Sequence, residues 1–188
     1  MTTLYIERSA AGGRNGNWIA ELALEPAPER IVVGTGPGSF AGIRAALAFA
    51  QGYALGRACE VLGLPSPCAI VGELLHSAPQ LPPASALAVV GDARRGMAWV
   101  ALFNGFNVER EVFQVPQAEL KAVVPADHGV VTPDAARIGT LLEETFGDRY
   151  LGGRTPTAEG LRAFAEANPS VLRSEPLPIY LNPAVRMV

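Results

Sequence analysis

Cysteine and histidine are scarce in this chain of 188 residues, which contains two of each. Cys59 and Cys68 form neither a C-x-x-C pair nor a disulfide framework, so we expect two buried, reduced thiols. His76 and His128 do not belong to an H-x-x-x-H pattern, and the sequence suggests no nucleophile–base pair. The sequence therefore predicts neither a metal site nor a histidine-based triad.

Long apolar runs and an excess of basic residues are absent as well. No apolar stretch reaches the roughly 18 residues that a membrane span requires, and Glu7 and Arg8 stand where a signal peptide would have its apolar core. The net charge of −3 gives no basic footprint of the kind that nucleic-acid binding uses. Because 49% of the residues are hydrophobic and 18% are charged, we expect a packed globular protein. From the missing signal-peptide pattern and membrane span we expect it to be soluble and cytoplasmic.

The most distinctive segment of the chain spans residues 31–56 and reads IVVGTGPGSFAGIRAALAFAQGYALG. Its pattern predicts a short strand at 31–33, a glycine-rich turn, and a helix over about 40–55. Ser39 is placed to cap this helix by accepting a hydrogen bond from a free amide of the first turn. We expect a structural role for the residues of the turn and cap, which are Gly34, Gly36, Pro37, Gly38 and Ser39.

The glycine turn invites comparison with phosphate-binding loops, in which free amides at a helix start hold an anion. Residues 31–56 contain no lysine, whereas the Walker loop requires Gly-Lys-Ser/Thr. Gly36 to Ala41 matches the G-x-G-x-x-G/A pattern, but a dinucleotide site needs an acid at the end of the next strand, and Glu60 stands at that strand's start. Nucleotide binding is therefore the weaker alternative.

The helix predicted at 40–55 has two apolar faces. One carries the larger residues Ile43, Ala46, Leu47, Ala50 and Ala54. A helix that is apolar on both sides needs a burial partner on each. The other face carries small residues, and we predict that it is a contact surface. Good helix propensity alone could also explain its alanines. The predicted interface residues are Ala41, Arg44, Ala45, Ala48, Gln51 and Gly52.

The remaining chain alternates between strand-like and helix-like segments. We expect strands at 3–8, 18–24, 60–64, 86–90, 97–103, 108–115 and 129–131. We expect helices at 69–77, 116–123, 133–146 and 157–167, and turns at 65–67 and 91–96. A Pro-rich linker at 78–84 is predicted to separate two small subdomains, residues 1–80 with the glycine turn and residues 84–188 with a β-meander and helices.

The run GTGPGSFAGIRAALAFAQGYALG resembles the most characteristic segment of the TsaB family, which takes part in threonylcarbamoyladenosine synthesis on bacterial tRNA. A second run, GDARRGMAWVALF, resembles the family's D-A-R-x-G-E-V-Y motif at Asp92, Arg94 and Gly96, with a methionine in place of the acid. Asp92 is predicted to bond the amides of its own turn. For Arg94 and Arg95, a solvated turn and a partner contact both stay open. The last motif, at 176–181, resembles the family's P-x-Y-L tail.

The front of the chain departs from the family pattern. TsaB proteins usually begin with a strand ending in I-D-T-S, whose aspartate belongs to an ancestral phosphate loop, whereas residues 6–9 read IERS here. The family also carries a further strand and a helix before the glycine turn, and that helix commonly contributes to its dimer interface. Too few residues separate 18–21 from Ile31 to hold both. The N-terminal region is therefore shortened relative to the family.

The resemblance implies an α/β chain with the actin/sugar-kinase-like (ribonuclease H-like) fold, truncated and built from two small subdomains. It also implies a non-catalytic partner of a TsaD-like enzyme, which transfers a threonylcarbamoyl group onto the adenosine at tRNA position 37. The partner's H-x-x-x-H metal motif is absent from this sequence, so we expect no metal, no cofactor and only indirect contact with tRNA. A TsaE-like ATPase is a further candidate partner.

Three alternatives stay open at this stage. The same helix could serve a self-associating homodimeric paralogue without a tRNA role, which the shortened front end favours. The glycine turn could belong to a nucleotide-binding enzyme. The wider family is labelled glycoprotease-like, but no nucleophile–base pair or zinc motif supports peptidase chemistry.

Overall fold

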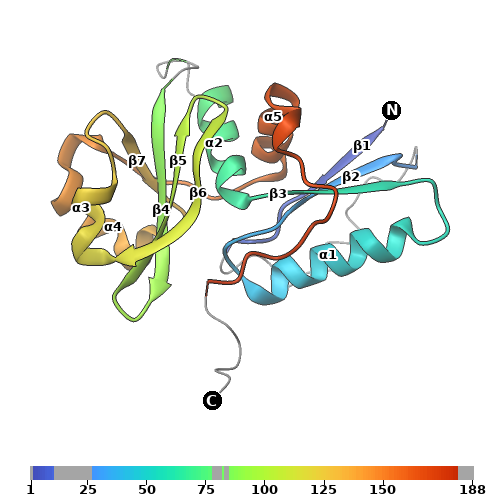
Figure 1. Ribbon diagram of the computed structural model, residues 1–188, viewed down its shortest axis with the longest axis horizontal. Coiled ribbons are helices and arrows are strands. Elements are labelled where there is room, and N and C mark those ends of the chain that lie inside the picture. The colour runs from blue at the N-terminus through green and yellow to red at the C-terminus, as the bar shows by residue number, and fades with distance from the viewer. Residues whose placement is uncertain (1, 11–26, 78–81, 83–84, 182–188) are drawn as a thin grey trace.

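The computed structural model describes residues 2–10, 27–77, 82 and 85–181, which contain two β-sheets (Figure 1). The first sheet is parallel with the order β1-β2-β3, and the second is mixed with the order β6-β5-β4-β7-β8. The first comprises β1 (Thr3–Ile6), β2 (Arg30–Gly34) and β3 (Glu60–Leu64). The second comprises β4 (Ala86–Arg94), β5 (Met97–Asn104), β6 (Asn107–Pro116), β7 (Gly129–Thr132) and β8 (Tyr150–Gly153).

Helices cover both sheets on both faces, so the described chain is built in alternating layers (Figure 1). α1 (Phe40–Ala54) packs on the outer face of the first sheet. α2 (Ser66–Ser77) and α5 (Ala158–Ala167) lie between the two sheets. α3 (Leu120–Val123) and α4 (Ala135–Phe146) cover the outer face of the second sheet, and short 3-10 turns occupy Gln117–Glu119, Gly147–Arg149 and Pro169–Val171.

In β2 and β4 the side chains alternate between two cores, which explains why these inner strands are largely apolar, whereas the edge strand β6 carries charged residues. In β2, Ile31 and Val33 pack against α1, while Val32 faces α2 and α5. In β4, Leu87 and Val89 face the same central layer, whereas the intervening residues face α4. A strand buried on both faces has no polar alternation, because neither set of side chains meets water.

The central helices α2 and α5 approach each other backbone to backbone. A methyl group added at Gly72 would overlap the carbonyl oxygen of Gly160, and one added at Gly160 would overlap that of Ala69. Thr157 caps α5, because its hydroxyl accepts a hydrogen bond from the Gly160 amide at 3.0 Å. The hydroxyl of Thr157 also donates to Glu73 on α2. This contact joins the C-terminal part of the chain to the N-terminal part.

The structure confirms the predicted strand at 60–64 and the helices near 40–55, 133–146 and 157–167, and it corrects three details. The turn predicted at 65–67 is wrong, because Ser66 and Pro67 open α2, and proline is tolerated in a first helical turn, where its missing N–H has no partner to lose. The turn predicted at 91–96 is much tighter, since β4 continues to Arg94. Strand β8 was not predicted.

Other predictions fall on residues that are only partly described. The strand predicted at 18–24 and most of the linker at 78–84 lie outside the described residues, and the division into 1–80 and 84–188 stays a prediction. Of the two thiols, Cys68 is buried but Cys59 is partly exposed, because it follows the exposed turn after α1. In the part of the chain that the structure describes, no helix is both long and apolar enough to cross a bilayer.

Candidate functional site

The glycine turn connects β2 to α1 and is fixed at its far end by the cap of the helix. The hydroxyl of Ser39 accepts a hydrogen bond from the Gly42 amide at 3.3 Å, and its carbonyl accepts one from the Ile43 amide at 2.9 Å. The amide of Ser39 in turn donates to the carbonyl of Ser9 at 2.7 Å. The start of α1 is therefore bonded to the segment that follows β1.

Other amides of the glycine turn also have partners within the protein. The Thr35 amide donates to the Leu64 carbonyl at 2.9 Å, and the Gly36 amide donates to the Ser66 hydroxyl at 3.0 Å. The Ile179 amide donates to the Thr35 carbonyl at 2.8 Å, so the C-terminal segment crosses the turn. These bonds consume donors that a phosphate-binding loop would direct at its ligand.

Three glycines of this region make room for residues 7–9. A methyl group at Gly34 would overlap the carboxyl group of Glu7, and one at Gly38 would overlap the carbonyl of Ser9. At Gly42, the obstacle is the carbonyl of Arg8. The glycines therefore allow the chain's own N-terminal segment to lie directly against the turn and the first turn of α1.

Glu7 lies beside Gly34 in this contact and is partly exposed, whereas Ser9 is buried. The Oε1 atom of Glu7 accepts a hydrogen bond from the Ser9 amide at 2.7 Å, whereas its buried Oε2 atom has no hydrogen-bond partner in the described structure. Burial raises the pKa of the Glu7 carboxyl above its ordinary value. Sequence reasoning missed this residue, since it noted only that the family's aspartate was absent. The available signal was an acid directly after an apolar strand.

A nucleotide phosphate, which the fold class would suggest, does not fit this arrangement. The amides of Thr35, Gly36 and Ser39 already donate to protein oxygens, and the Glu7 carboxyl occupies the space beside Gly34. A phosphate group would also meet an acidic side chain there, where an anion site needs positive potential. The glycine turn is therefore paired with other residues of the same chain and not with a phosphate.

The outer face of α1 carries all six residues of the predicted interface. Ala41, Arg44, Ala45, Ala48, Gln51 and Gly52 are exposed, while Ile43, Ala46, Leu47 and Ala50 are buried against the first sheet. A methyl group added at Gly52 would meet no described atom within 4 Å. Apart from Arg44 and Gln51, the face therefore consists of small residues, and none of the described elements covers it.

Aromatic and cationic groups border the N-terminal end of this face. The Phe40 ring is 48% exposed and lies 5.2 Å, between ring centroids, from the ring of Tyr180, which is 46% exposed. The guanidinium carbon of Arg44 stands 5.1 Å from the centre of the Phe40 ring. Tyr180 belongs to the C-terminal motif, so the tail contributes to the same surface.

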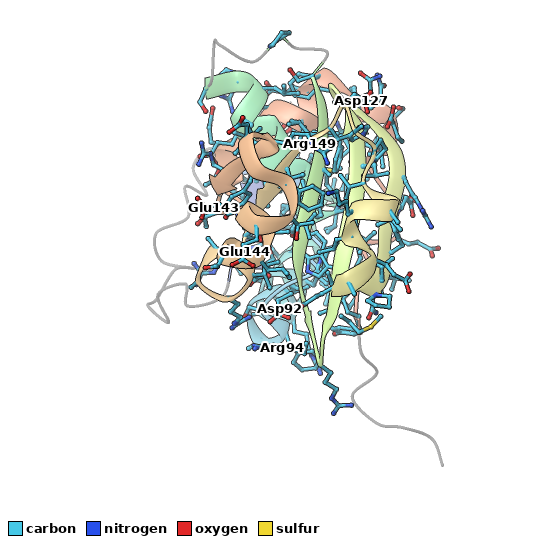
Figure 2. The ribbon with its side chains drawn as sticks, turned by 90° about the vertical axis from the view of Figure 1, so that its left-hand side faces the viewer. Asp92, Arg94, Asp127, Glu143, Glu144 and Arg149 are labelled. Carbon is cyan, nitrogen blue, oxygen red and sulfur yellow. The ribbon has the colours of Figure 1, made fainter. Side chains whose placement is uncertain are left out.

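The hairpin motif lies at one end of the second sheet, where Asp92 and Arg94 project near the start of α4 (Figure 2). The Asp92 carboxylate accepts a hydrogen bond from the Arg94 amide at 2.8 Å, and the Asp92 amide donates to the Asp134 carboxylate at 3.0 Å. Arg95 and Gly96 form the two-residue connection with φ of 54° and 73°, the left-handed pair that a tight hairpin turn requires.

A cleft of about 360 Å³ joins this hairpin to the glycine turn. Ser39 and Phe40 line one wall, and Asp92, Arg94 and Arg137 line the other. The structure thus brings the predicted cap and the predicted hairpin motif to one cleft. The small-residue stripe of α1 is separate from it and faces outward.

The histidines are not part of this region. His128 is buried, with Nδ1 at 2.9 Å from Asp127 and Nε2 at 3.1 Å from Glu109. Figure 2 shows Asp127 and Asp92 at opposite ends of the second sheet. The hydrogen bond from His128 lowers the pKa of Asp127. Within the described ranges, no group of three His, Cys, Asp or Glu side chains is arranged to hold a metal ion.

Comparison with known proteins places the chain in a family. The family model described as "TsaD: tRNA N6-adenosine threonylcarbamoyltransferase" matches residues 17–122. The chain belongs to the TsaD family. Among curated proteins, no match to this TsaD-family chain was found.

Two solved structures from Pseudomonas aeruginosa share the fold. One, described as YeaZ, superposes with a TM-score of 0.62 at 22% identity and covers 89% of this chain and 80% of its own. The other, described as an uncharacterized protein with similarity to peptidase YEAZ, gives a TM-score of 0.62 at 22% identity, with 87% and 78% covered. The predicted actin-like fold and the resemblance to a TsaB-like protein are confirmed at the level of fold and family.

Proposed function

We propose that this TsaD-family chain supports threonylcarbamoyl modification of tRNA as a non-catalytic partner of a TsaD-like enzyme. The matching family is described by that reaction, which supports the pathway. The observation that carries the partner role is the outer face of α1, where Ala41, Ala45, Ala48 and Gly52 are exposed along a helix whose other side is buried.

Small side chains let a second helix approach closely, because the distance between packed helices depends on the side chains at the contact. Within this chain, α2 and α5 approach each other in this way at Gly72 and Gly160. An uncovered face of similar composition on α1 therefore suits a helix of another molecule. Arg44 and Phe40 at its border supply the aromatic and arginine side chains that dominate binding energy in many interfaces.

The non-catalytic part of the proposal is supported by the glycine turn. Its amides are paired within the protein and the Glu7 carboxyl lies beside Gly34, so the chain's own residues occupy the place of a phosphate. Catalysis by the complex would then belong to the partner. Contact with tRNA would be indirect, consistent with the net charge of −3.

The test is co-expression with the TsaD-like protein of the same organism, followed by light scattering on a sizing column. We expect a one-to-one complex for the natural chain and for Ala136→Glu, a matched control at an exposed site on α4. Ala48→Glu should abolish the complex, because it buries an unpaired carboxylate in the contact. Its circular dichroism and melting temperature should equal those of the natural chain.

Two results would contradict the proposal. If a folded Ala48→Glu variant still formed the complex, the outer face of α1 would not be part of the interface. A natural chain that forms a homodimer and ignores the TsaD-like protein would instead favour self-association through this face without a tRNA role.

A further inference from the structure

The proposed function leaves the hairpin motif without a role, although the backbone of this hairpin is unusual. Arg94 and Arg95 have φ of 67° and 54°, in the left-handed region that favours glycine. Arginine is strained in this conformation, and strained residues persist where the surroundings or the function of a site hold them. The side chain of Arg94 is 60% exposed, so packing inside the protein does not account for an arginine at this position.

Arg94 and Arg137, which lies on α4, are brought together by the carboxylate of Asp92. Asp92 and Arg94 lie together at one end of the second sheet (Figure 2). The Oδ2 atom of Asp92 is 3.5 Å from Nη1 of Arg94 and 3.8 Å from Nη1 of Arg137, and the Asp134 carboxylate is 3.4 Å from that same Arg137 nitrogen. The side chains of Asp92 and Asp134 are 10% and 15% exposed, whereas that of Arg137 is 39% exposed. The acids therefore lie deeper than the two guanidinium groups.

Backbone hydrogen bonds fix the two acids. Asp92 accepts from the Arg94 amide at 2.8 Å, Asp134 accepts from the Asp92 amide at 3.0 Å, and the Asp134 amide donates to the Thr132 hydroxyl at 3.0 Å. Among the described residues, the guanidinium group of Arg94 has an ion pair with Asp92 but no hydrogen bond. Its N–H donors are therefore positioned by the fold and available to a ligand.

The opposite wall of the same cleft, whose volume is about 360 Å³, is aromatic. The rings of Phe40 and Tyr180 are each about half exposed, and 5.2 Å separates their centroids. Trp99 of β5 lines the cleft as well. The cleft thus combines a few placed polar groups with apolar side chains, which is the usual composition of a ligand pocket.

We propose that this cleft is a carboxylate-binding site, in which Arg94 and Arg137 hold the carboxylate and the rings of Phe40 and Tyr180 contact an apolar group of the same ligand. A guanidinium group presents parallel N–H donors whose spacing matches the two oxygens of a carboxylate. The carboxylate belongs either to a small organic acid or to an acidic side chain of a partner protein, since both present the same group.

The charges around the site favour a carboxylate over a phosphate. Asp92 and Asp134 both lie within 4 Å of Arg137, so the two acids offset the charges of the two arginines. A phosphate group would bring a charge of about −2 next to these acids, whereas a carboxylate brings a single charge. A nucleic-acid backbone is held by a row of cations, which this wall of the cleft does not supply.

The first experiment uses N-acetyl-phenylalanine, which joins a carboxylate to an aromatic ring, and its amide, which has a similar shape without the charge. Binding to the natural chain is followed by NMR of the arginine side chains. We expect the acid to bind about tenfold more tightly than the amide and to shift the signals of Arg94 and Arg137. Inorganic phosphate should bind more weakly than the acid. Tighter binding of phosphate would overturn the carboxylate assignment.

Substitutions then test the two arginines. Arg94→Gln and Arg137→Gln should each weaken binding of the acid by about tenfold and leave binding of the amide unchanged. Arg110→Gln is the matched control, because Arg110 is exposed on β6 and does not line the cleft. Arg94→Gly separates binding from stability, since glycine adopts the left-handed backbone without strain. It should melt at or above the temperature of the natural chain and still bind the acid more weakly.

The complex with the TsaD-like protein of the same organism identifies the source of the carboxylate. If Arg94→Gln and Arg137→Gln weaken this complex while Arg110→Gln does not, the carboxylate is a side chain of the partner. If the complex is unchanged but the acid binds in a charge-dependent way, the ligand is a small organic acid. The proposal is overturned if the acid binds no better than the amide and the complex is also insensitive to both substitutions.

The carboxylate site does not depend on the proposed function. A natural chain that fails to pair with a TsaD-like protein would refute the proposed function, and the titration with the acid and its amide would then decide the site alone. Conversely, a chain that pairs through α1 but responds to neither arginine substitution nor the charge of the probe would refute the site and leave the proposed function standing.

Discussion

Two small-residue helix surfaces occur among the residues that the structure describes, and only one of them is covered there. Between α2 and α5, Gly72 and Gly160 bring the backbones of two helices into direct contact. On α1, Ala48 and Gly52 are exposed, and the position of a methyl group at Gly52 is open. The same kind of residue therefore marks a completed contact in one place and an available surface in the other. What distinguishes them is whether the fold supplies a second helix.

Substitutions in the covered surface between α2 and α5 should lower the free energy of unfolding more than substitutions in the open surface of α1. Gly72→Leu places a side chain where the Gly160 carbonyl lies, and backbone cannot move aside as a flexible side chain can. We expect the free energy of unfolding to fall by about 3 kcal/mol, at the upper end of overpacking effects. Urea unfolding would measure it. An unchanged midpoint and slope would mean that α2 and α5 do not approach as described.

The caps of α1 and α5 offer a second comparison. Ser39→Ala removes the hydroxyl that accepts from Gly42, and we expect a loss of about 1 kcal/mol in the free energy of unfolding. Thr157→Ala should cost more, because its hydroxyl both accepts from Gly160 and donates to Glu73 across the helix contact. Thermal unfolding of both variants would rank them. The reverse order would indicate that the covered contact does not depend on its cap.

The open surface of α1 should tolerate substitution, and one substitution there should even stabilise the isolated chain. Gly52→Ala fills open space on an exposed helix, so we expect the free energy of unfolding of the isolated chain to rise by about 0.5 kcal/mol. A matched Gly72→Ala variant should lower it instead. Urea titrations of the two proteins suffice, and a loss of stability in Gly52→Ala would show that something within the chain covers that site.

Several elements could be predicted from local pattern alone. The 40–55 helix follows from Ser39, the apolar spacing behind it and Gly56, and the observed helix spans Phe40–Ala54. The helix ending at Phe146 follows from its amphipathic spacing. These predictions succeeded because caps and periodicity act over a few neighbouring residues.

The failures have a different physical origin. Strand β8 is four residues long and contains two glycines, so its strand character comes from pairing with β7 and not from propensity. The tight turn at Arg95 and Gly96 depends on the register between β4 and β5. The pairing of His128 with Glu109 joins residues of different segments, which no local pattern reveals.

The sequence by itself determined that a glycine turn leads into a helix with two apolar faces, because turn residues, cap and helical spacing are all local. Only the tertiary structure decided what fills the turn. The parallel register that sets Ile6 opposite Val33 carries Glu7 to Gly34 and Ser9 to the cap of α1. Burial of the carboxyl in this contact raises the pKa of Glu7 above its ordinary value.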